Sequence, residues 1–102
     1  MIGTMAGGAY GDSMPIVMAS GKTITPLIHS ITFTIKNPGR DAATTRVFAM
    51  TGEEVAELSA VSFNRFVWDG KNTDQEDVGA GFYVVQIQQN GAFWHGPVIV
   101  KR

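Results

Sequence analysis

Strict alternation of apolar and polar side chains constrains the fold of this chain more than any other feature. In Ser30–Lys36 the apolar residues Ile31, Phe33 and Ile35 alternate with serine, threonine and lysine. In Gly81–Gln89 the residues Tyr83, Val85 and Ile87 share one face, and Val84, Gln86 and Gln88 share the other. No segment shows a sustained helical period. A period of two places one face of a strand against a core and the other face in water. The chain is therefore expected to fold from strands.

Turn signals divide the chain into seven short runs of strand character. The runs are Met14–Ala19, His29–Lys36, Thr44–Met50, Glu53–Leu58, Phe63–Trp68, Gly81–Gln89 and Phe93–Lys101. Asn90-Gly91 predicts a type I′ hairpin turn, because both residues accept positive φ. Short strands separated by turns about every 8–12 residues are typical of sandwiches and barrels. The sequence has no internal repeat, so we predict one all-β sandwich or barrel rather than a propeller or solenoid.

The stretch covering residues 66–88 contains the expected core anchors. Trp68 ends one predicted strand with its ring directed inward, and Tyr83 lies on the inward face of a later strand. Asp69-Gly70 predicts the turn after Trp68, because aspartate can accept backbone N–H groups and glycine accepts positive φ. We therefore expect the two rings to pack in the core, with a polar loop between their strands.

Two prolines indicate where the sheets end. Pro15 opens the run Met14–Ala19, which suits an edge strand because proline cannot donate to a sheet hydrogen bond. Pro97 interrupts the last predicted strand, which indicates either an edge strand or a bulge near Gly96.

The first part of the chain differs in composition from the rest. Residues 1–24 are rich in glycine at their start and form a predicted N-terminal arm, whereas residues 25–102 form the predicted domain. Within the arm only the run around Ile16, Val17 and Met18 has strand character. We expect this run to add as a strand to a sheet edge, either its own or that of a neighbouring molecule.

Charge and composition exclude several classes of function. The formal net charge is -1, with 8 basic and 9 acidic residues spread along the chain, so the basic patch of a nucleic-acid binder is missing. No apolar run reaches the ~20 residues that span a bilayer, so membrane insertion is not expected. The absence of cysteine removes disulfides, thiolate metal sites and cysteine nucleophiles. No signal peptide is recognisable, so an export signal would have been removed or belong to a longer parent chain.

Five oxygen-bearing side chains gather in one predicted loop: Asp69, Asn72, Asp74, Glu76 and Asp77. Calcium takes about 6–8 oxygen ligands and could bind to such a loop, although the spacing is not that of an EF-hand. The leading interpretation is a solvated turn in which side chains accept backbone hydrogen bonds, and calcium is the alternative. No other cofactor is predicted.

A catalytic serine is the only enzymatic candidate in the sequence. Gly11-Asp-Ser-Met14 resembles the nucleophile block of the GDSL-type hydrolases, but the downstream Asp-x-x-His of those enzymes is absent. A serine nucleophile needs a base within hydrogen-bond reach, and His29 and His95 are the only histidines, both in predicted strands. Two histidines alone also cannot complete a zinc site. We therefore predict that the chain is not an enzyme.

The aromatic pair Phe93 and Trp94 leaves two interpretations open. Aromatic residues on an edge strand can cap the core, or they can form a contact patch of the kind enriched in interfaces. If Trp94 were exposed beside polar groups, the pair could also stack on sugar rings, as in a carbohydrate-binding module.

Several short motifs together resemble a known family. They are Arg46-Val-Phe, Gly52-Glu-Glu-Val, Phe66-x-Trp68-Asp-Gly70, Gly81-Phe-Tyr-Val-Val and the terminal Val-Lys-Arg. This pattern, over about residues 25–102, resembles the immunoglobulin-like domain of the bacterial flagellar hook-capping protein. Related domains occur at the C-termini of secreted and surface proteins, including proteins exported by type IX secretion. Gln75-Glu76 departs from the family, which usually has a glycine-containing turn there.

The resemblance implies an immunoglobulin-like antiparallel β-sandwich of about seven strands. It also implies a non-catalytic spacer, assembly or export-linked module, extracellular or on the cell surface, whose partners are proteins: other domains of a parent chain or identical subunits. Lys101-Arg102 is compatible with a C-terminal sorting role. The alternative is a self-assembling filament subunit that donates a strand from its N-terminal arm, and the third hypothesis is a carbohydrate-binding module.

Overall fold

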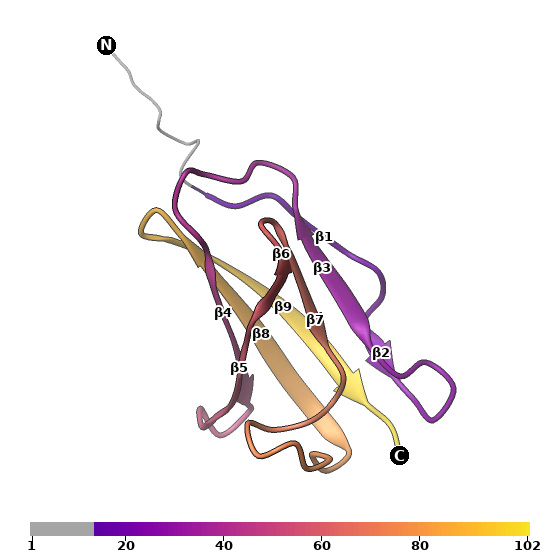
Figure 1. Ribbon diagram of the computed structural model, residues 1–102. Helices are drawn as coiled ribbons and strands as arrows, with labels where there is room; N and C mark the ends of the chain where they lie inside the picture. The colour runs from indigo at the N-terminus through magenta and orange to yellow at the C-terminus, as the bar shows by residue number, and fades with distance from the viewer. Residues whose placement is uncertain (1–13) are drawn as a thin grey trace.

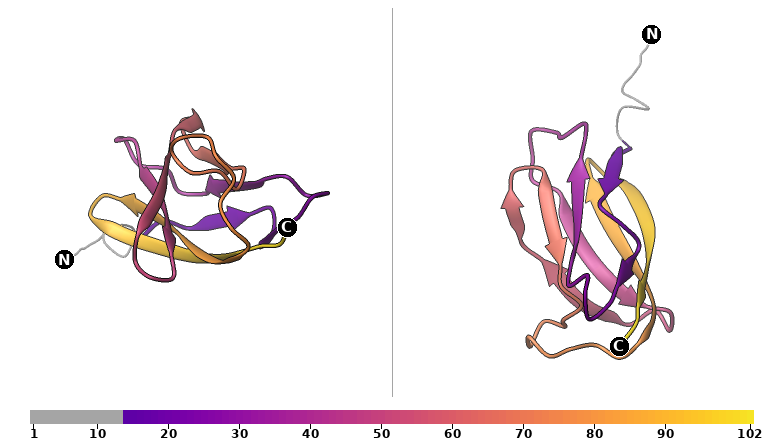
Figure 2. Two further views of the ribbon diagram at one scale, coloured as in Figure 1. Left: turned by 90° about the horizontal axis from the view of Figure 1, so that it is seen from below. Right: turned by 90° about the vertical axis from the view of Figure 1, so that its right-hand side faces the viewer.

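The computed structural model describes residues 14–102, which form nine strands joined by turns (Figure 1). The strands are β1 (Val17–Ala19), β2 (Thr23–Ile24), β3 (Ile31–Ile35), β4 (Thr44–Ala49), β5 (Glu54–Leu58), β6 (Ala60–Ser62), β7 (Arg65–Trp68), β8 (Gly81–Gln89) and β9 (Ala92–Val100). A four-stranded sheet, β1-β3-β7-β6, faces a five-stranded sheet, β2-β9-β8-β4-β5 (Figure 2). These residues contain no helix, and hence none that could cross a membrane. The predicted all-β sandwich is confirmed.

The connectivity is that of an immunoglobulin-type sandwich. β1 pairs antiparallel with β3, and the chain then crosses to the other sheet, where β2 pairs parallel with β9. All other neighbours in the two sheets are antiparallel. A four-stranded sheet facing a sheet extended by one further strand matches the arrangement of immunoglobulin domains. Residues 17–24, assigned to the arm from the sequence, thus supply an edge strand to each sheet.

Two strands, β2 and β6, are absent from the predicted set of seven. Each has only two or three residues, which is too short to show alternation. The predicted strand Phe63–Trp68 begins later, at Arg65, because Phe63 lies in the β6–β7 turn with 76% of its surface exposed.

The expected core anchors meet between the two sheets. Trp68 is fully buried and lies edge-on to the ring of Tyr83, with 5.4 Å between the ring centroids. Its indole N–H donates to the carbonyl oxygen of Lys71 at 2.9 Å, so the only polar atom of the ring is satisfied. Phe33 and Phe66 fill the neighbouring layer.

Tyr83 also fixes the entry into β8. Its hydroxyl donates to the carbonyl oxygen of Gly79, four residues earlier, at 2.7 Å. Immunoglobulin sandwiches have the same device, a tyrosine near the start of the corresponding strand that bonds back to the backbone upstream. Val85, two residues later, is fully buried.

The structure decides between the two explanations of Pro97. The register between β8 and β9 runs without a shift from one end to the other, so the predicted bulge near Gly96 is wrong. β2 covers only Ile99 and Val100, which leaves β9 as an edge strand at Pro97. The N–H of Ile99 donates to the carbonyl oxygen of Lys22, directly before β2. The backbone nitrogen of Pro97, two residues earlier, therefore faces the open edge, and no sheet bond is lost. Gly96 serves a different purpose, because a methyl group there would overlap the ring of Trp94.

Candidate functional site

The loop between β7 and β8 holds the five calcium candidates in an ordered turn. The Lys71 N–H donates to the carboxylate of Asp69 at 3.2 Å. The side-chain oxygen of Asn72 accepts the N–H groups of Asp74 and Glu76 at 2.9 and 3.0 Å. These are the aspartate and asparagine turns that the leading interpretation predicts.

Two further carboxylates of the loop, those of Asp77 and Glu76, also have partners. Asp77 lies 3.2 Å from the ammonium of Lys71 and 3.9 Å from the guanidinium of Arg102. The amide of Asn72 donates to the carboxylate of Glu76 at 3.3 Å. Nowhere within residues 14–102 do three histidine, cysteine, aspartate or glutamate side chains gather closely enough to hold a metal ion. Side-chain oxygens of four of the five candidates are thus engaged in bonds within the protein, those of Asp69, Asn72, Glu76 and Asp77.

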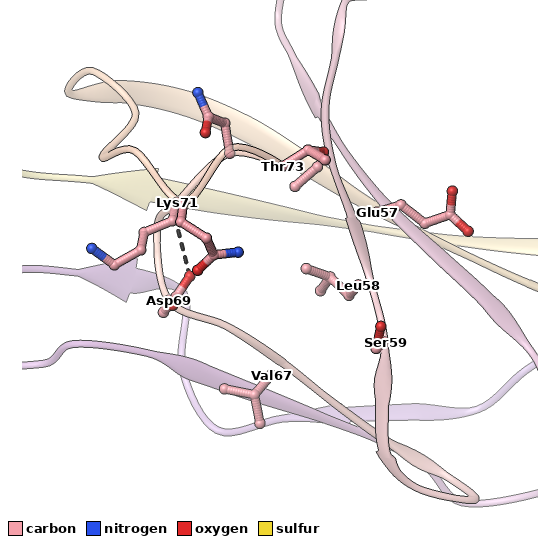
Figure 3. Close-up of a pocket in the computed structure, with 10 residues that line it drawn as sticks. Glu57, Leu58, Ser59, Val67, Asp69, Lys71 and Thr73 are labelled. Atoms are coloured by element: carbon pink, nitrogen blue, oxygen red, sulfur yellow. Dashed lines mark hydrogen bonds between the residues drawn. The ribbon is translucent and has the colours of Figure 1, made fainter.

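A cleft of about 270 Å³ lies where this loop passes β5 (Figure 3). The Thr73 N–H donates to the carbonyl oxygen of Val55 at 3.1 Å and fastens the loop to the strand. Leu58 and Val67 contribute apolar surface, and the polar side chains of the loop form the opposite wall. The cleft is the open side of the sandwich between β5 and β7, partly closed by the loop.

Arg102 is a clamp that the sequence did not reveal. Its guanidinium donates to the carbonyl oxygen of Gly70 at 2.8 Å and to that of Val78 at 2.9 and 3.1 Å. It therefore closes the base of the β7–β8 loop, whose ends are also joined by the bond from the Val78 N–H to the Gly70 carbonyl at 3.0 Å. In the sequence this residue belongs to the terminal Val-Lys-Arg motif, which does not predict a clamp.

The two histidines lie in different surroundings. His29 precedes β3 instead of lying in a strand, and its Nε2 is 2.6 Å from the carbonyl oxygen of Pro26. His95 lies on the outward face of β9, and its Nε2 is 3.0 Å from the side-chain oxygen of Gln86. Of the predicted serine block only Met14 is described, since residues 11–13 lie outside the described part of the chain.

The interaction candidates Ile16, Val17 and Met18 lie at the edge of their own sheet. Asn37 anchors this segment, because its side-chain oxygen accepts the Ile16 N–H at 2.7 Å and its amide donates to the Met14 carbonyl at 3.0 Å. Val17 packs against the core, whereas Ile16 and Met18 are exposed. Of the two alternatives for this strand, the structure contains the one within the molecule.

The two residues of the aromatic pair, Phe93 and Trp94, point to opposite sides of β9. Trp94 points inward and meets Phe33 edge-on, with 6.0 Å between ring centroids, so it caps the core. Phe93 points outward and stacks with His95 at 6.2 Å. The partly buried ring of Trp94 does not offer the exposed face that the carbohydrate hypothesis needs.

The outer face of the five-stranded sheet carries an apolar surface that the alternation pattern does not predict. Phe48, Val84 and Pro97 lie side by side across β4, β8 and β9, and Phe82 pairs with Ile99 in the next row. We call these five residues and Met50 the outer apolar face. Met50 and Phe82 are 69% and 62% exposed. Phe48, Met50 and Val84 border a shallow depression of about 310 Å³.

The other sheet shows what a solvated outer face looks like in this protein. The centre of the four-stranded sheet presents Thr32, Thr34 and Arg65 outward. Antiparallel sheets with one face in water normally alternate in this way. On this sheet the outward apolar residues Met18 and Val67 lie beside threonines, whereas Phe48, Val84 and Pro97 of the outer apolar face lie side by side.

Comparisons with known proteins identify a fold but no family. No family model and no curated protein matches the chain, so the resemblance to the hook-capping family receives no support. Among solved structures, the chain is similar to part of PorZ, an essential bacterial surface component of the type-IX secretion system of Porphyromonas gingivalis. The match has a TM-score of 0.63 and 18% identity, and it covers 84% of this chain but 11% of the PorZ chain. At this identity the likeness shows that the two share a fold.

Proposed function

We propose that this chain is a protein-interaction module of a secreted or cell-surface bacterial protein, linked to type IX export. The observation that carries the proposal is the outer apolar face. A surface-exposed cluster of large apolar side chains is a common mark of a protein–protein contact site. The charged side chains on this sheet face, Arg46, Glu54 and Glu57, lie together on the β5 side, and charge depletion distinguishes the centre of interfaces.

The fold comparison supports the cellular setting. PorZ is described as a surface component of the type-IX secretion system, and this chain spans 11% of its length. A domain of this size fits a module within a longer exported protein, and its partners would be proteins, either neighbouring domains or identical subunits. The site geometry adds support for a role without catalysis, because the polar residues of the β7–β8 loop serve turns and clamps.

A reporter experiment tests the export link. The whole chain would be fused to the C-terminus of a reporter protein and expressed in Porphyromonas gingivalis. The reporter would carry a signal peptide for transport across the inner membrane. We expect the reporter to reach the cell surface or medium in the parent strain and to stay inside a strain that lacks PorZ. The reporter without the module is the control and should stay inside both strains. Retention of the fused reporter in both strains would contradict the export link.

A further inference from the structure

We infer that the outer apolar face is the contact surface of a two-fold symmetric homodimer, in which two five-stranded sheets pack face to face. The inference rests on the proposed interaction role and names the partner as a second copy of this chain. Packed sheets lie about 10 Å apart and interdigitate their side chains. The outer apolar face supplies large side chains for such a layer across β4, β8 and β9.

The arrangement of charge around the face identifies the partner. Glu54 and Glu57 lie along the β5 margin, where they share Arg46 at 3.4 and 4.0 Å. The opposite margin carries His95 on β9 and Lys101 directly after it. One margin is therefore acidic on balance and the other is neutral to basic, with the outer apolar face and the polar pair Arg46 and Gln86 between them.

A two-fold axis parallel to the strands brings unlike margins together. It reverses the order of the strands, so with the axis between β4 and β8, β5 of one copy lies over β9 of the other and β4 lies over β8. The row Glu57, Arg46, Gln86 and His95 then lies over its own reverse, which places each Glu57 opposite a partner-copy histidine. A two-fold axis across the strands would instead stack the acidic margins on each other, which costs free energy. Charge therefore selects the first arrangement.

The sheet edges favour contact through the face. Pro97 removes a donor from the open edge of β9, and Glu53, Glu54 and Glu57 place charges along β5. Proline and charge on edge strands oppose pairing with the edge of another molecule. An isologous contact through the face also closes on itself, so the inferred assembly stops at two copies.

A matched pair of substitutions tests the interface. Val84 and Thr34 are both half-buried residues that point outward from the middle of a central strand, one on each sheet. Sedimentation equilibrium of the whole chain should show a concentration-dependent dimer. Val84→Lys should raise the dimer dissociation constant at least about tenfold, because the ammonium would be buried in an apolar contact. Thr34→Lys should leave the dissociation constant unchanged, and circular dichroism would confirm that both variants fold.

Disulfide trapping tests the orientation, since the chain has no cysteine of its own. Gln86 lies on β8, near the inferred axis, so Gln86→Cys should form a dimer under mild oxidation, and Thr34→Cys should not. A disulfide can span two packed sheets, as it does inside immunoglobulin domains. The double variant Glu57→Cys/His95→Cys should crosslink into dimers, whereas Glu57→Cys alone should not. Crosslinking of Glu57→Cys alone would overturn the orientation.

The outcomes separate this inference from the export proposal. A wild-type chain that stays monomeric up to high micromolar concentration would overturn the homodimer, and so would a Val84→Lys variant that dimerises like wild type. Neither result affects the reporter experiment, which measures export in cells. Conversely, a trapped dimer whose reporter fusion is retained would support the homodimer and contradict the export link.

Discussion

At the scale of single residues, the core contains one polar group without a partner. Thr45 on β4 points inward between Leu58 and Ile87, is fully buried, and its hydroxyl has no hydrogen-bond partner among the described residues. A buried hydroxyl without a partner costs about 1–3 kcal/mol relative to solvation in water. Valine has nearly the same shape without this cost.

Thr45→Val is therefore expected to raise the free energy of unfolding by about 1 kcal/mol. Urea denaturation followed by fluorescence measures the change. Thr32→Val is the control, because Thr32 is half-buried on the outer face of β3, and its effect should stay within about 0.5 kcal/mol. A loss of stability in Thr45→Val would show that the hydroxyl is satisfied in solution.

Gly96 has no room for a side chain, because the ring of Trp94 occupies the place of its Cβ. Gly96→Ala should lower the free energy of unfolding by about 1–3 kcal/mol, because the added methyl group forces the ring of Trp94 out of its place. Combining it with Trp94→Leu should cost less than the sum of the single variants, as expected for residues in contact. Gly21→Ala is the control, since no atom lies within 4 Å of the added methyl group. Strict additivity of the two changes would contradict the close approach.

At the scale of elements, β1 depends on a side chain from another part of the chain. Asn37→Ala removes both bonds to the segment before β1, so amide hydrogen exchange at Val17–Ala19 should become faster, while β8 keeps its protection. Asn64→Ala is the matched control. Its amide donates to the Ile35 carbonyl at 3.0 Å, so its loss should loosen the β6–β7 turn and leave β1 unchanged. Equal exchange at β1 in both variants would show that strand pairing alone holds it.

The strands that the sequence predicted well are those with a single buried face. β3 and the inward residues of β8 follow a period of two without exception, so their existence and orientation could be predicted. The orientation of Trp94 was also within reach. A two-residue turn at Asn90-Gly91 pairs Gln89 with Ala92 and hence Ile87 with Trp94, which places the indole on the buried face.

Other features could not be predicted because they depend on distant contacts. The Arg102 clamp needs the position of Gly70 and Val78, which only the assembled sheets provide. β2 is two residues long and exists because β9 offers it an edge. The outer apolar face was hidden for another reason. In the first half of β8, apolar residues point to both sides, so the alternation of apolar and polar residues does not mark the outward side chains as a separate surface.

At the scale of the whole molecule, the first two strands lie in different sheets: β1 is an edge strand of the four-stranded sheet, and β2 is an edge strand of the five-stranded sheet. β1 starts at the upper end in Figure 1, and β9 ends at the lower end. Between them, β2 runs parallel to β9, and the carbonyl oxygens of Lys22 and Ile24 accept the N–H groups of Ile99 and Lys101, both at 2.8 Å.

Parallel pairing of the first and last segments gives the domain a direction of mechanical strength. Tension applied between residue 14 and residue 102 would pull β2 and β9 past each other along their length. The two hydrogen bonds that Ile99 and Lys101 donate would then be loaded in shear at the same time and would not break one after the other. A domain built in this way resists stretching most strongly along the line that joins residues 14 and 102.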